Sequence, residues 1–410
     1  MADSIKDSLP NIYNNSWEHL HDELKLLDLI LERQVLLCRE SGSLFSGDSF
    51  RGLTITESEI IQLLAASKET SRNDLSCVQQ LTWQIEQLDS EIRERIRFTC
   101  EQGKYLSLQR LIDIFKLNEF ETKVLIIALA PELDVKYEKI YGFLQDDLSR
   151  KKPGIHLVLN LLCRTVEEQW IARLAFEPAT PLVRYLIEII HYPSDAPPTL
   201  IRQCIKLEHR IVNFLLEYNQ VDDRIHNWVE LKSWEPQTLL DGDSQQLSKR
   251  IKDFLQQLRK PVPDGTAKVI FYFSGPWGVG KKYRVQQICQ QFGIPVLIAD
   301  IRRVLHSGRV GNENIRFVGR EAVLQQAALC FDNFDLLADE HGNYSSIDFL
   351  ELDKSILNFG LPLFLLGRDV INIDNASNYV VIQVEQMPPD LIQRKKLWQT
   401  MAAGFPVNPD

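Results

Sequence analysis

The segment VIFYFSGPWGVGKK, residues 269–282, decides the fold of the C-terminal part of this chain. An apolar, strand-like run is followed at once by the motif G-x-x-x-x-G-K, and a helical pattern begins at Lys281. In that context the motif is specific for a phosphate-binding loop. Gly275, Gly278 and Gly280 let backbone N–H groups curl around a phosphate without steric clash, and the following helix start adds free N–H groups.

We therefore expect this loop and the first turn of the next helix to bind nucleotide. The ammonium group of Lys281 is expected to reach the β- and γ-phosphates. The alternative is a glycine-rich turn that never contacts phosphate. The predicted nucleotide-binding residues are Gly275, Pro276, Trp277, Gly278, Val279, Gly280, Lys281 and Lys282.

Lys282 departs from the usual motif. A phosphate-binding loop normally has Ser or Thr here, so that a hydroxyl joins the Mg²⁺ shell. An ammonium has three donors and no lone pair, so it cannot ligate a cation and repels one. We expect Lys282 to neutralise phosphate directly in place of the metal, and Mg²⁺ binding is accordingly uncertain.

A second motif, LCFDN at residues 329–333, has the form of a Walker B strand. Asp332 is placed to hold Mg²⁺ indirectly, through a water; the alternative is a simple strand-end cap. Asn333 stands where a catalytic Glu would polarise the attacking water, and a neutral amide cannot take a proton. Asp335 lies beyond the strand end and is a poor geometric substitute.

The end of a later strand gives no clear assignment. A polar side chain that contacts the γ-phosphate is expected there, but the chain has Gly367 and Arg368, to which we assign no role. Asn372 is a distant second choice.

Strand-like and helical runs alternate through the C-terminal part. Continuous apolar strands separated by helices indicate a parallel sheet that is covered on both faces. We predict an α/β fold with a five-stranded parallel sheet. The predicted strands are 269–274, 295–301, 328–334, 362–367 and 379–384, and the predicted helices are 281–292, 316–327 and 347–359.

The N-terminal half is predicted to be helical. Apolar residues three and four apart indicate a long helix over residues 16–40, with Asn15 as its cap and Glu18 as the reciprocal capping partner. Such a stripe usually packs against its own protein; a coiled coil with a partner is the alternative. Residues 50–55 lead into a predicted short helix over 58–67.

Three short helices are expected next, over 108–115, 120–129 and 137–148, with Pro131 ending the second. Followed by the segments 157–162 and 207–211, they suit a winged-helix-like module. The second helix carries only Lys123 as a cation, so we expect packing or protein interaction there and no DNA binding.

Composition supports a cytoplasmic protein. The net charge of −10 argues against bulk attraction to nucleic acid or anionic membranes, and no apolar run is long enough to span a bilayer. The seven cysteines are scattered without a CxxC pair, which indicates reduced thiols and no zinc site.

The motifs GPWGVGKK and LCFDNFD, with five strands in this order, resemble an AAA+ ATPase domain from about residue 248 onward. The segments NNSWEHLHDELKLLDLILERQVL, FRGLTI, LNEFETKVLIIALAPELDVKYEKIYGFLQDD and LEHRIVNFLL resemble the winged-helix front of one bacterial AAA+ group. That group is often encoded beside phage-tail-like contractile injection systems. The resemblance implies a degenerate first ATPase domain, which in that group precedes an intact second one.

The resemblance implies ATP or ADP as ligand, weak or no hydrolysis, and a homo-oligomeric ring that remodels protein assemblies. Partners from a contractile injection system, no DNA and no membrane are expected. An active AAA+ ATPase and a nucleotide-free interaction scaffold remain open as alternatives.

The predicted domain order ends in an incomplete helical lid, which suggests a fragment of a longer protein. The predicted regions are an N-terminal helical region at 1–88, a winged-helix-like domain at 89–235, a linker and leading helix at 236–265, the AAA+ core at 266–387 and the start of the lid at 388–410.

Overall fold

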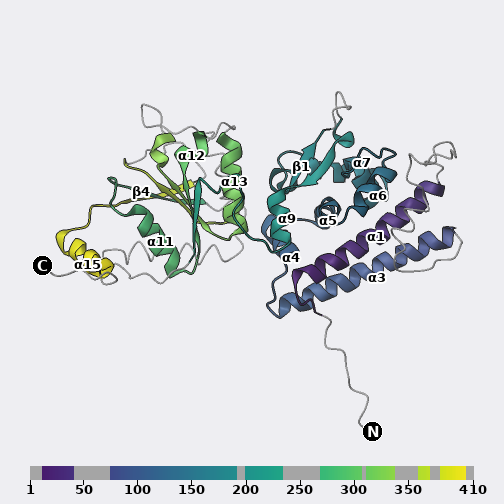
Figure 1. Cartoon of the computed structure of the whole chain (residues 1–410), viewed down its shortest axis with the longest axis horizontal. Helices are drawn as coiled ribbons and strands as arrows, with labels where there is room; N and C mark the ends of the chain where they lie inside the picture. The colour runs from purple at the N-terminus through teal and green to yellow at the C-terminus, as the bar shows by residue number, and fades with distance from the viewer. Residues whose placement is uncertain are drawn as a thin grey trace, which may run out of the picture. The chain divides into compact units, whose positions relative to one another are not determined.

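A computed structural model describes residues 12–40, 74–191, 199–233, 268–306, 311–337, 359–369 and 379–402 (Figure 1). The chain divides into two compact units, Met1–Gln220 and Val221–Asp410, which are described separately. The predictions for residues 50–67, 234–259 and 347–358 and for Asn372 lie outside the described residues.

The first unit opens with two long helices, α1 (Ser16–Glu40) and α3 (Asp74–Glu101), which pack along each other. The predicted helix over 16–40 is confirmed. Asn15 caps it, with Oδ1 accepting from the Glu18 N–H at 2.9 Å. The Glu18 carboxylate, however, accepts from the N–H of Asn14 at 3.0 Å and not from that of Asn15. The buried stripe starts at Leu20, because Trp17 is 53% exposed.

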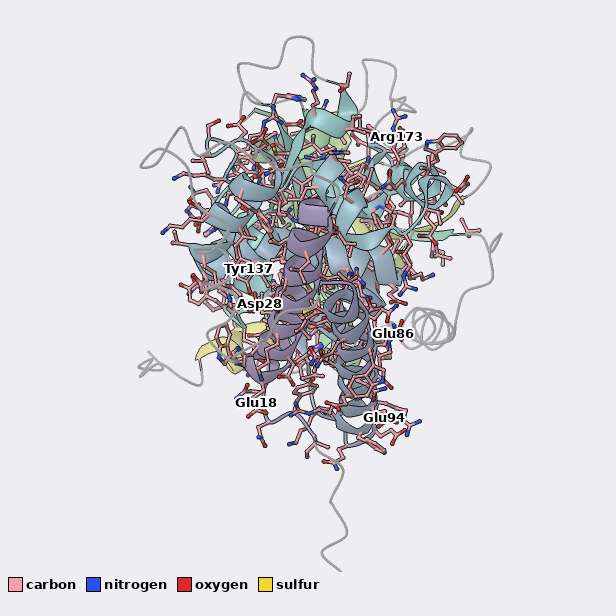
Figure 2. The ribbon with its side chains drawn as sticks, turned by 90° about the vertical axis from the view of Figure 1, so that its right-hand side faces the viewer. Glu18, Asp28, Glu86, Glu94, Tyr137 and Arg173 are labelled. Atoms are coloured by element: carbon pink, nitrogen blue, oxygen red, sulfur yellow. The ribbon has the colours of Figure 1, made fainter. Side chains whose placement is uncertain are left out.

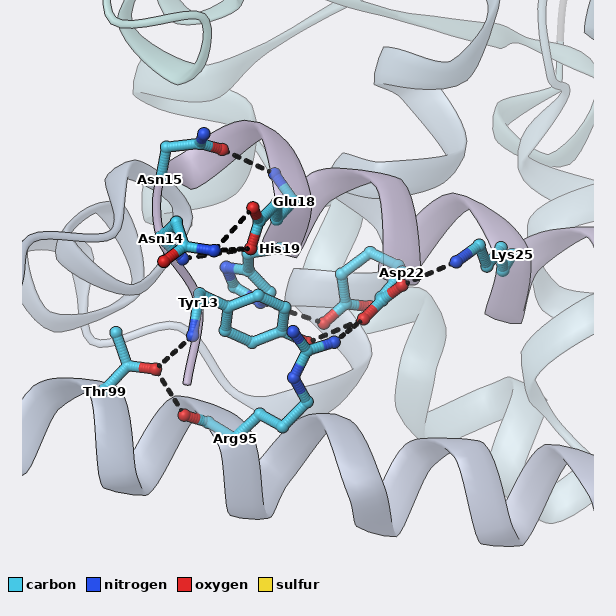
Figure 3. A network of polar contacts seen from close by, with 10 residues as sticks. Tyr13, Asn14, Asn15, Glu18, His19, Asp22, Lys25, Arg95 and Thr99 are labelled. Carbon is cyan, nitrogen blue, oxygen red and sulfur yellow. Dashed lines mark hydrogen bonds and ion pairs between the residues drawn. The ribbon is translucent and has the colours of Figure 1, made fainter. Parts of the chain in front are cut away.

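A polar network ties the start of α1 to the end of α3, so the two helices run antiparallel (Figure 3). The N–H of Tyr13 donates to Thr99 Oγ1 at 3.0 Å, and the Tyr13 hydroxyl donates to Asp22 Oδ2 at 3.3 Å. Arg95 pairs with the same Asp22 carboxylate, and its guanidinium lies 4.0 Å from the centre of the Tyr13 ring. Burial, followed by the charge of Asp22, raises the pKa of Tyr13. α1 therefore packs within its own chain, as the sequence favoured.

Short helices and one β-hairpin complete the first unit. The hairpin pairs β1 (Ile187–Ile190) with β2 (Cys204–Leu207) antiparallel, and Gly154 adds an isolated bridge to Cys204. The short elements are α4 (Ser107–Phe115), α5 (Glu119–Leu133), α6 (Lys136–Leu144), α7 (Ile155–Leu162), α8 (Val166–Ala172), η2 (Arg173–Phe176), η3 (Leu182–Leu186), η4 (Leu200–Arg202) and α9 (His209–Leu215).

One detail of the predicted winged-helix module needs correction. Pro131 does not end the second helix: α5 continues to Leu133 and holds Pro131 inside it. α5 also buries residues 124–131 in the core of the unit, which agrees with the packing expected of this helix. The last α-helix before the hairpin is α8, and η2 and η3 lie between it and β1.

The second unit contains a six-stranded mixed sheet, not the predicted five-stranded parallel one. The five predicted strands are present and mutually parallel: β4 (Lys268–Ser274), β5 (Val296–Asp300), β6 (Ala328–Asp332), β7 (Leu363–Leu366) and β8 (Tyr379–Glu385). The sixth strand, β3 (Val229–Lys232), pairs antiparallel with the edge of β5. The sheet order is β3-β5-β6-β7-β4-β8, so β7 separates β6 from β4.

Helices cover both faces of the sheet, as expected for buried parallel strands. α11 (Lys281–Gln291) packs on one face with Val285 and Ile288. α12 (Ile301–His306) and α13 (Gly311–Leu324) pack on the other with Val304 and Val318. η5 (Phe334–Leu337) follows β6, and α15 (Leu391–Ala402) follows β8.

No helix in the described part of the chain combines the length and the apolar character needed to cross a bilayer.

Candidate functional site: a phosphate-binding loop with an internal ion pair

The loop between β4 and α11 has the geometry that its glycines predict. Gly275, Gly278 and Gly280 all have positive φ, at 144°, 79° and 88°. At Gly275 a Cβ atom would lie 2.3 Å from the carbonyl oxygen of Gln386, just beyond β8, so only glycine fits. Gly280 is the left-handed residue directly before the first turn of α11. The loop thus ends at a helix N-terminus, where backbone N–H groups are free to bind an anion.

The Lys281 side chain turns back onto this loop. Its Nζ donates to the carbonyl oxygens of Gly275 at 2.5 Å and Pro276 at 3.0 Å. Burial lowers the pKa of the Lys281 ammonium more than the nearby Asp332 carboxylate raises it. A bound phosphate would replace neutral carbonyl acceptors with a charged one, which forms the stronger hydrogen bond.

Lys282, the residue that departs from the motif, pairs with the Walker B carboxylate. Its Nζ lies 2.6 Å from Asp332 Oδ2, with side chains that are 52% and 15% exposed. Lys282 follows β4 and Asp332 ends β6. Because β7 lies between these two strands in the sheet, the contact reaches across the end of β7. The ammonium therefore already occupies one oxygen of the carboxylate that was expected to hold Mg²⁺ indirectly.

Asn333 joins two carboxylates at the ends of neighbouring strands. Asp300 and Asp332 are directly opposite each other in the β5–β6 register. Nδ2 of Asn333 donates to Asp300 Oδ1 and to Asp332 Oδ2, both at 3.1 Å. Its backbone is left-handed, with φ of 59°, a conformation that Asn tolerates better than most residues. Asn333 thus uses its amide to hold two carboxylates together, at the position where a base was expected.

Arg302 neutralises the second of these carboxylates. Its Nε and Nη2 donate to Asp300 Oδ1 at 3.1 Å and Oδ2 at 2.9 Å. Burial would raise the pKa of Asp300, but hydrogen bonds from Arg302 and Asn333 outweigh it and hold that pKa below its ordinary value. Both strand-end carboxylates are therefore engaged by this chain's own donors.

These residues do not fit Mg²⁺. Oδ2 of Asp332 already accepts from Lys282 and Asn333, and the ammonium repels a cation at the same place. Among the residues that the structure describes, no group of three His, Cys, Asp or Glu side chains could hold a metal ion.

Two arginines at the rim complete the site, and the sequence assigned neither a role. The Arg368 guanidinium lies 4.5 Å from the centre of the Trp277 ring, and that of Arg302 lies 6.0 Å from it. Trp277 is 56% exposed in the middle of the loop. Arg302 follows β5 and Arg368 follows β7, at the carboxyl edge where open parallel sheets bind ligands. The signal in the sequence that could have identified these two arginines is their position directly after a predicted strand.

The family model for the winged helix domain, variant, matches residues 2–229 of this chain. The chain therefore belongs to the family that is described as a variant of the winged helix domain. A comparison with curated proteins gives no match.

Among solved structures, two similar chains are FIGL-1 AAA domains. The FIGL-1 AAA domain in complex with ADP is 15% identical, with a TM-score of 0.35, over 45% of this chain and 68% of that one. A second FIGL-1 AAA domain is 13% identical, with a TM-score of 0.34, over 45% and 67%. At this level of likeness neither structure determines the function of this chain.

Proposed function

We propose that the second unit is a nucleotide-binding module of the AAA+ type that binds ATP or ADP without Mg²⁺ and hydrolyses ATP weakly or not at all. The observation that carries the proposal is the 2.6 Å ion pair between Lys282 and Asp332. It places the ammonium group of a lysine where other phosphate-binding loops recruit a metal.

The charge around the loop supports an anionic ligand. Lys281 and Lys282 begin α11, and Arg302 and Arg368 lie against Trp277. Positive charge at a helix N-terminus, with free N–H groups, is the usual setting for phosphate. The ligand's phosphates would take the place of the loop carbonyls as acceptors for Lys281.

The expected weakness in hydrolysis follows from two positions. Lys282 supplies no metal ligand, and Asn333 cannot accept a proton while its amide donates to two carboxylates. General-base catalysis contributes about 10²–10⁴-fold to a rate. An arginine from a neighbouring subunit, worth about 10³–10⁵ in related phosphoryl-transfer sites, would be a further requirement.

Steady-state phosphate release tests this part of the proposal. The unmodified chain should show no turnover above background. The double variant Lys282→Thr with Asn333→Glu should improve Mg²⁺–ATP binding while its turnover stays slow in the isolated chain. Release by the unmodified chain near the ~10 s⁻¹ typical of enzymes would favour an active AAA+ ATPase instead.

One observation favours a second candidate, a nucleotide-free interaction scaffold. The Lys281 ammonium already has two carbonyl partners within its own loop. The test is binding of fluorescent ATP and ADP analogues to the unmodified chain and to Lys281→Ala. Loss of the phosphate contact should weaken binding by about 1.5–3 kcal/mol. Lys232→Ala, which removes an exposed lysine of β3, is the matched control and should bind normally.

We further propose that the module is a structural or regulatory part of a homo-oligomeric ring that remodels protein assemblies. Its proposed clients, components of a contractile injection system, rest only on the resemblance in sequence. Sedimentation of the chain with and without ATP tests the ring. A monomer under both conditions would contradict assembly by this chain alone.

A further inference from the structure

Helix α8 and the η2 turn that continues it carry a stripe of apolar side chains exposed to solvent. Val166, Trp170, Ile171 and Leu174 are 55%, 71%, 71% and 63% exposed, and α8 buries none of its residues. Residues four apart lie on the same face of a helix, so Val166, Trp170 and Leu174 form one row with Ile171 beside it. We call these four residues the α8 patch. A helix that served only its own core would turn such a row inward.

The α8 patch is held in this outward position by polar contacts. The Glu168 N–H donates to Thr165 Oγ1 at 3.2 Å, and the Thr165 N–H donates to Glu168 Oε2 at 3.3 Å, which is a capping box. Gln169 Nε2 donates to Asn160 Oδ1 of α7 at 3.1 Å. Phe176, at the end of η2, is buried. Because the patch is already ordered, a partner would lose little conformational entropy on binding it.

The charged residues of α8, of η2 and directly after η2 are mostly acidic. Arg164, just before α8, pairs with Glu86 of α3 at 3.3 Å, and Arg33 of α1 also lies near that carboxylate. Figure 2 shows Glu86 and Arg173 on the same side of the unit. The other charged residues of the segment 164–177 are three carboxylates and one guanidinium: Glu167, Glu168, Glu177 and Arg173. Glu167 lies one turn from Ile171, and Glu177 lies one turn from Leu174, so carboxylates stand at both ends of the row.

This charge excludes the two simplest occupants. DNA-binding helices neutralise phosphates with Lys and Arg, whereas in α8, in η2 and directly after η2 three carboxylates stand beside one arginine. A second copy that paired antiparallel through the same patch would bring Glu167 of one copy toward Glu177 of the other, because a two-fold interface brings together two copies of the same surface. An exposed aromatic and aliphatic cluster is nevertheless the usual core of a protein interface.

We propose that the α8 patch docks an amphipathic helix of a different protein. The apolar side chains of that helix cover Trp170 and Leu174, and its Lys or Arg side chains pair with Glu167 and Glu177. Packing of one helix row into the groove of another accounts for the apolar part, and the carboxylates select partners of opposite charge. This inference is independent of the nucleotide site.

The experiment uses two fluorescein-labelled synthetic helices and the full chain. Both peptides carry Leu at spacings of three and four residues. The remaining positions are Lys in one peptide and Glu in the other. Fluorescence anisotropy should show the Lys/Leu peptide binding about tenfold or more tightly than the Glu/Leu peptide, and the difference should shrink with salt. Equal affinities for the two peptides would overturn the proposed charge selection.

Two double variants locate the binding. Trp170→Ser with Leu174→Ser should weaken the Lys/Leu peptide by about tenfold or more, as loss of two central anchors does. Trp398→Ser with Leu391→Ser is the matched control. It removes the same two residue types from α15, where they are 75% exposed but lie near Arg394 and Lys395 in the sequence. The control should bind within a factor of about two, a difference of well under 1 kcal/mol.

The remaining outcomes also decide the proposal. Equal loss in both double variants, or loss in neither, would overturn it. Competition by duplex DNA would assign the patch to nucleic acid. A dimer of the unmodified chain that Trp170→Ser with Leu174→Ser dissolves in sedimentation would assign it to a second copy. Charge reversal with Glu167→Lys and Glu177→Lys should weaken the Lys/Leu peptide without changing the circular dichroism spectrum.

Discussion

Two carboxylates in the second unit lie at the same distance from a cation, yet they serve different purposes. Asp222 is 2.6 Å from Nη2 of Arg320, and Asp332 is 2.6 Å from Nζ of Lys282. The Asp222–Arg320 pair is buried, with side chains 6% and 1% exposed. In the Asp332–Lys282 pair the lysine is 52% exposed. The Asp222–Arg320 pair is therefore structural, whereas the Asp332–Lys282 pair is accessible to a ligand.

Solvent explains the difference. A buried carboxylate that loses a cation bears more of its desolvation cost, so removing the partner destabilises the fold. Burial would raise the pKa of Asp222, but hydrogen bonds from Arg224 and the charge of Arg320 lower it to about 2. An exposed pair is screened by water and contributes little to stability, so Lys282 can exchange Asp332 for a phosphate at small cost.

The largest expected effect is on the buried pair. Arg320→Ala should lower the free energy of unfolding by about 3–5 kcal/mol, because it leaves Asp222 buried beside a single remaining arginine. Urea denaturation measures it. Arg303→Ala, whose guanidinium is 65% exposed and 3.9 Å from Asp300, should cost less than about 1 kcal/mol. Similar losses for the two variants would remove the distinction between buried and exposed pairs.

A smaller effect is expected from pH. The pKa of Asp222 is about 2 in the folded chain and 3.8 ordinarily, so its stabilising contribution is present above pH 4 and lost as the pH falls toward 2. The lowered pKa corresponds to about 2 kcal/mol. Asp222→Asn should remove that part of the acid sensitivity, which urea titrations between about pH 5 and pH 2 would show. If the free energy of unfolding depends on pH as in the unmodified chain, other carboxylates cause the loss of stability in acid.

The smallest effect on stability is expected at the exposed pair. Lys282→Thr should change the free energy of unfolding by less than about 1 kcal/mol. It should also make ATP binding sensitive to Mg²⁺, because a hydroxyl can join the metal shell and Asp332 no longer pairs with the ammonium group of Lys282. Lys282→Met removes the charge without supplying a hydroxyl, and is the control that should gain less from Mg²⁺. A Lys282→Thr variant that stays indifferent to Mg²⁺ would contradict this role of Lys282.

Much of the second unit followed from local patterns, since five apolar runs and one glycine-rich loop specify five parallel strands and the loop between β4 and α11. Strand β3 did not, because VELK is short and its pairing of Leu231 with Leu297 is distant in sequence. The compact units divide at Gln220, so β3 lies in the second unit.

The sequence named several of the residues that come together at the loop, but not their pairing and not the part of Asp300, Arg302 and Arg368. The sequence identified Lys282 and Asn333 as departures, and it could not show which carboxylates they contact. Asp300 enters the site only through the β5–β6 register, which places it opposite Asp332. The α8 patch has the same origin: its spacing resembles that of any amphipathic helix, and only the folded chain shows that the row points outward.

The most direct test of the central claim is ATP affinity measured by calorimetry with millimolar Mg²⁺ and again with excess EDTA. Because Lys282 supplies the positive charge beside Asp332, the unmodified chain should bind ATP with the same affinity in both, within a factor of about three. Affinity that falls by about tenfold or more in EDTA, equivalent to 1.4 kcal/mol, would show that a metal and not Lys282 supplies this charge. Absence of binding in both would contradict nucleotide recognition itself.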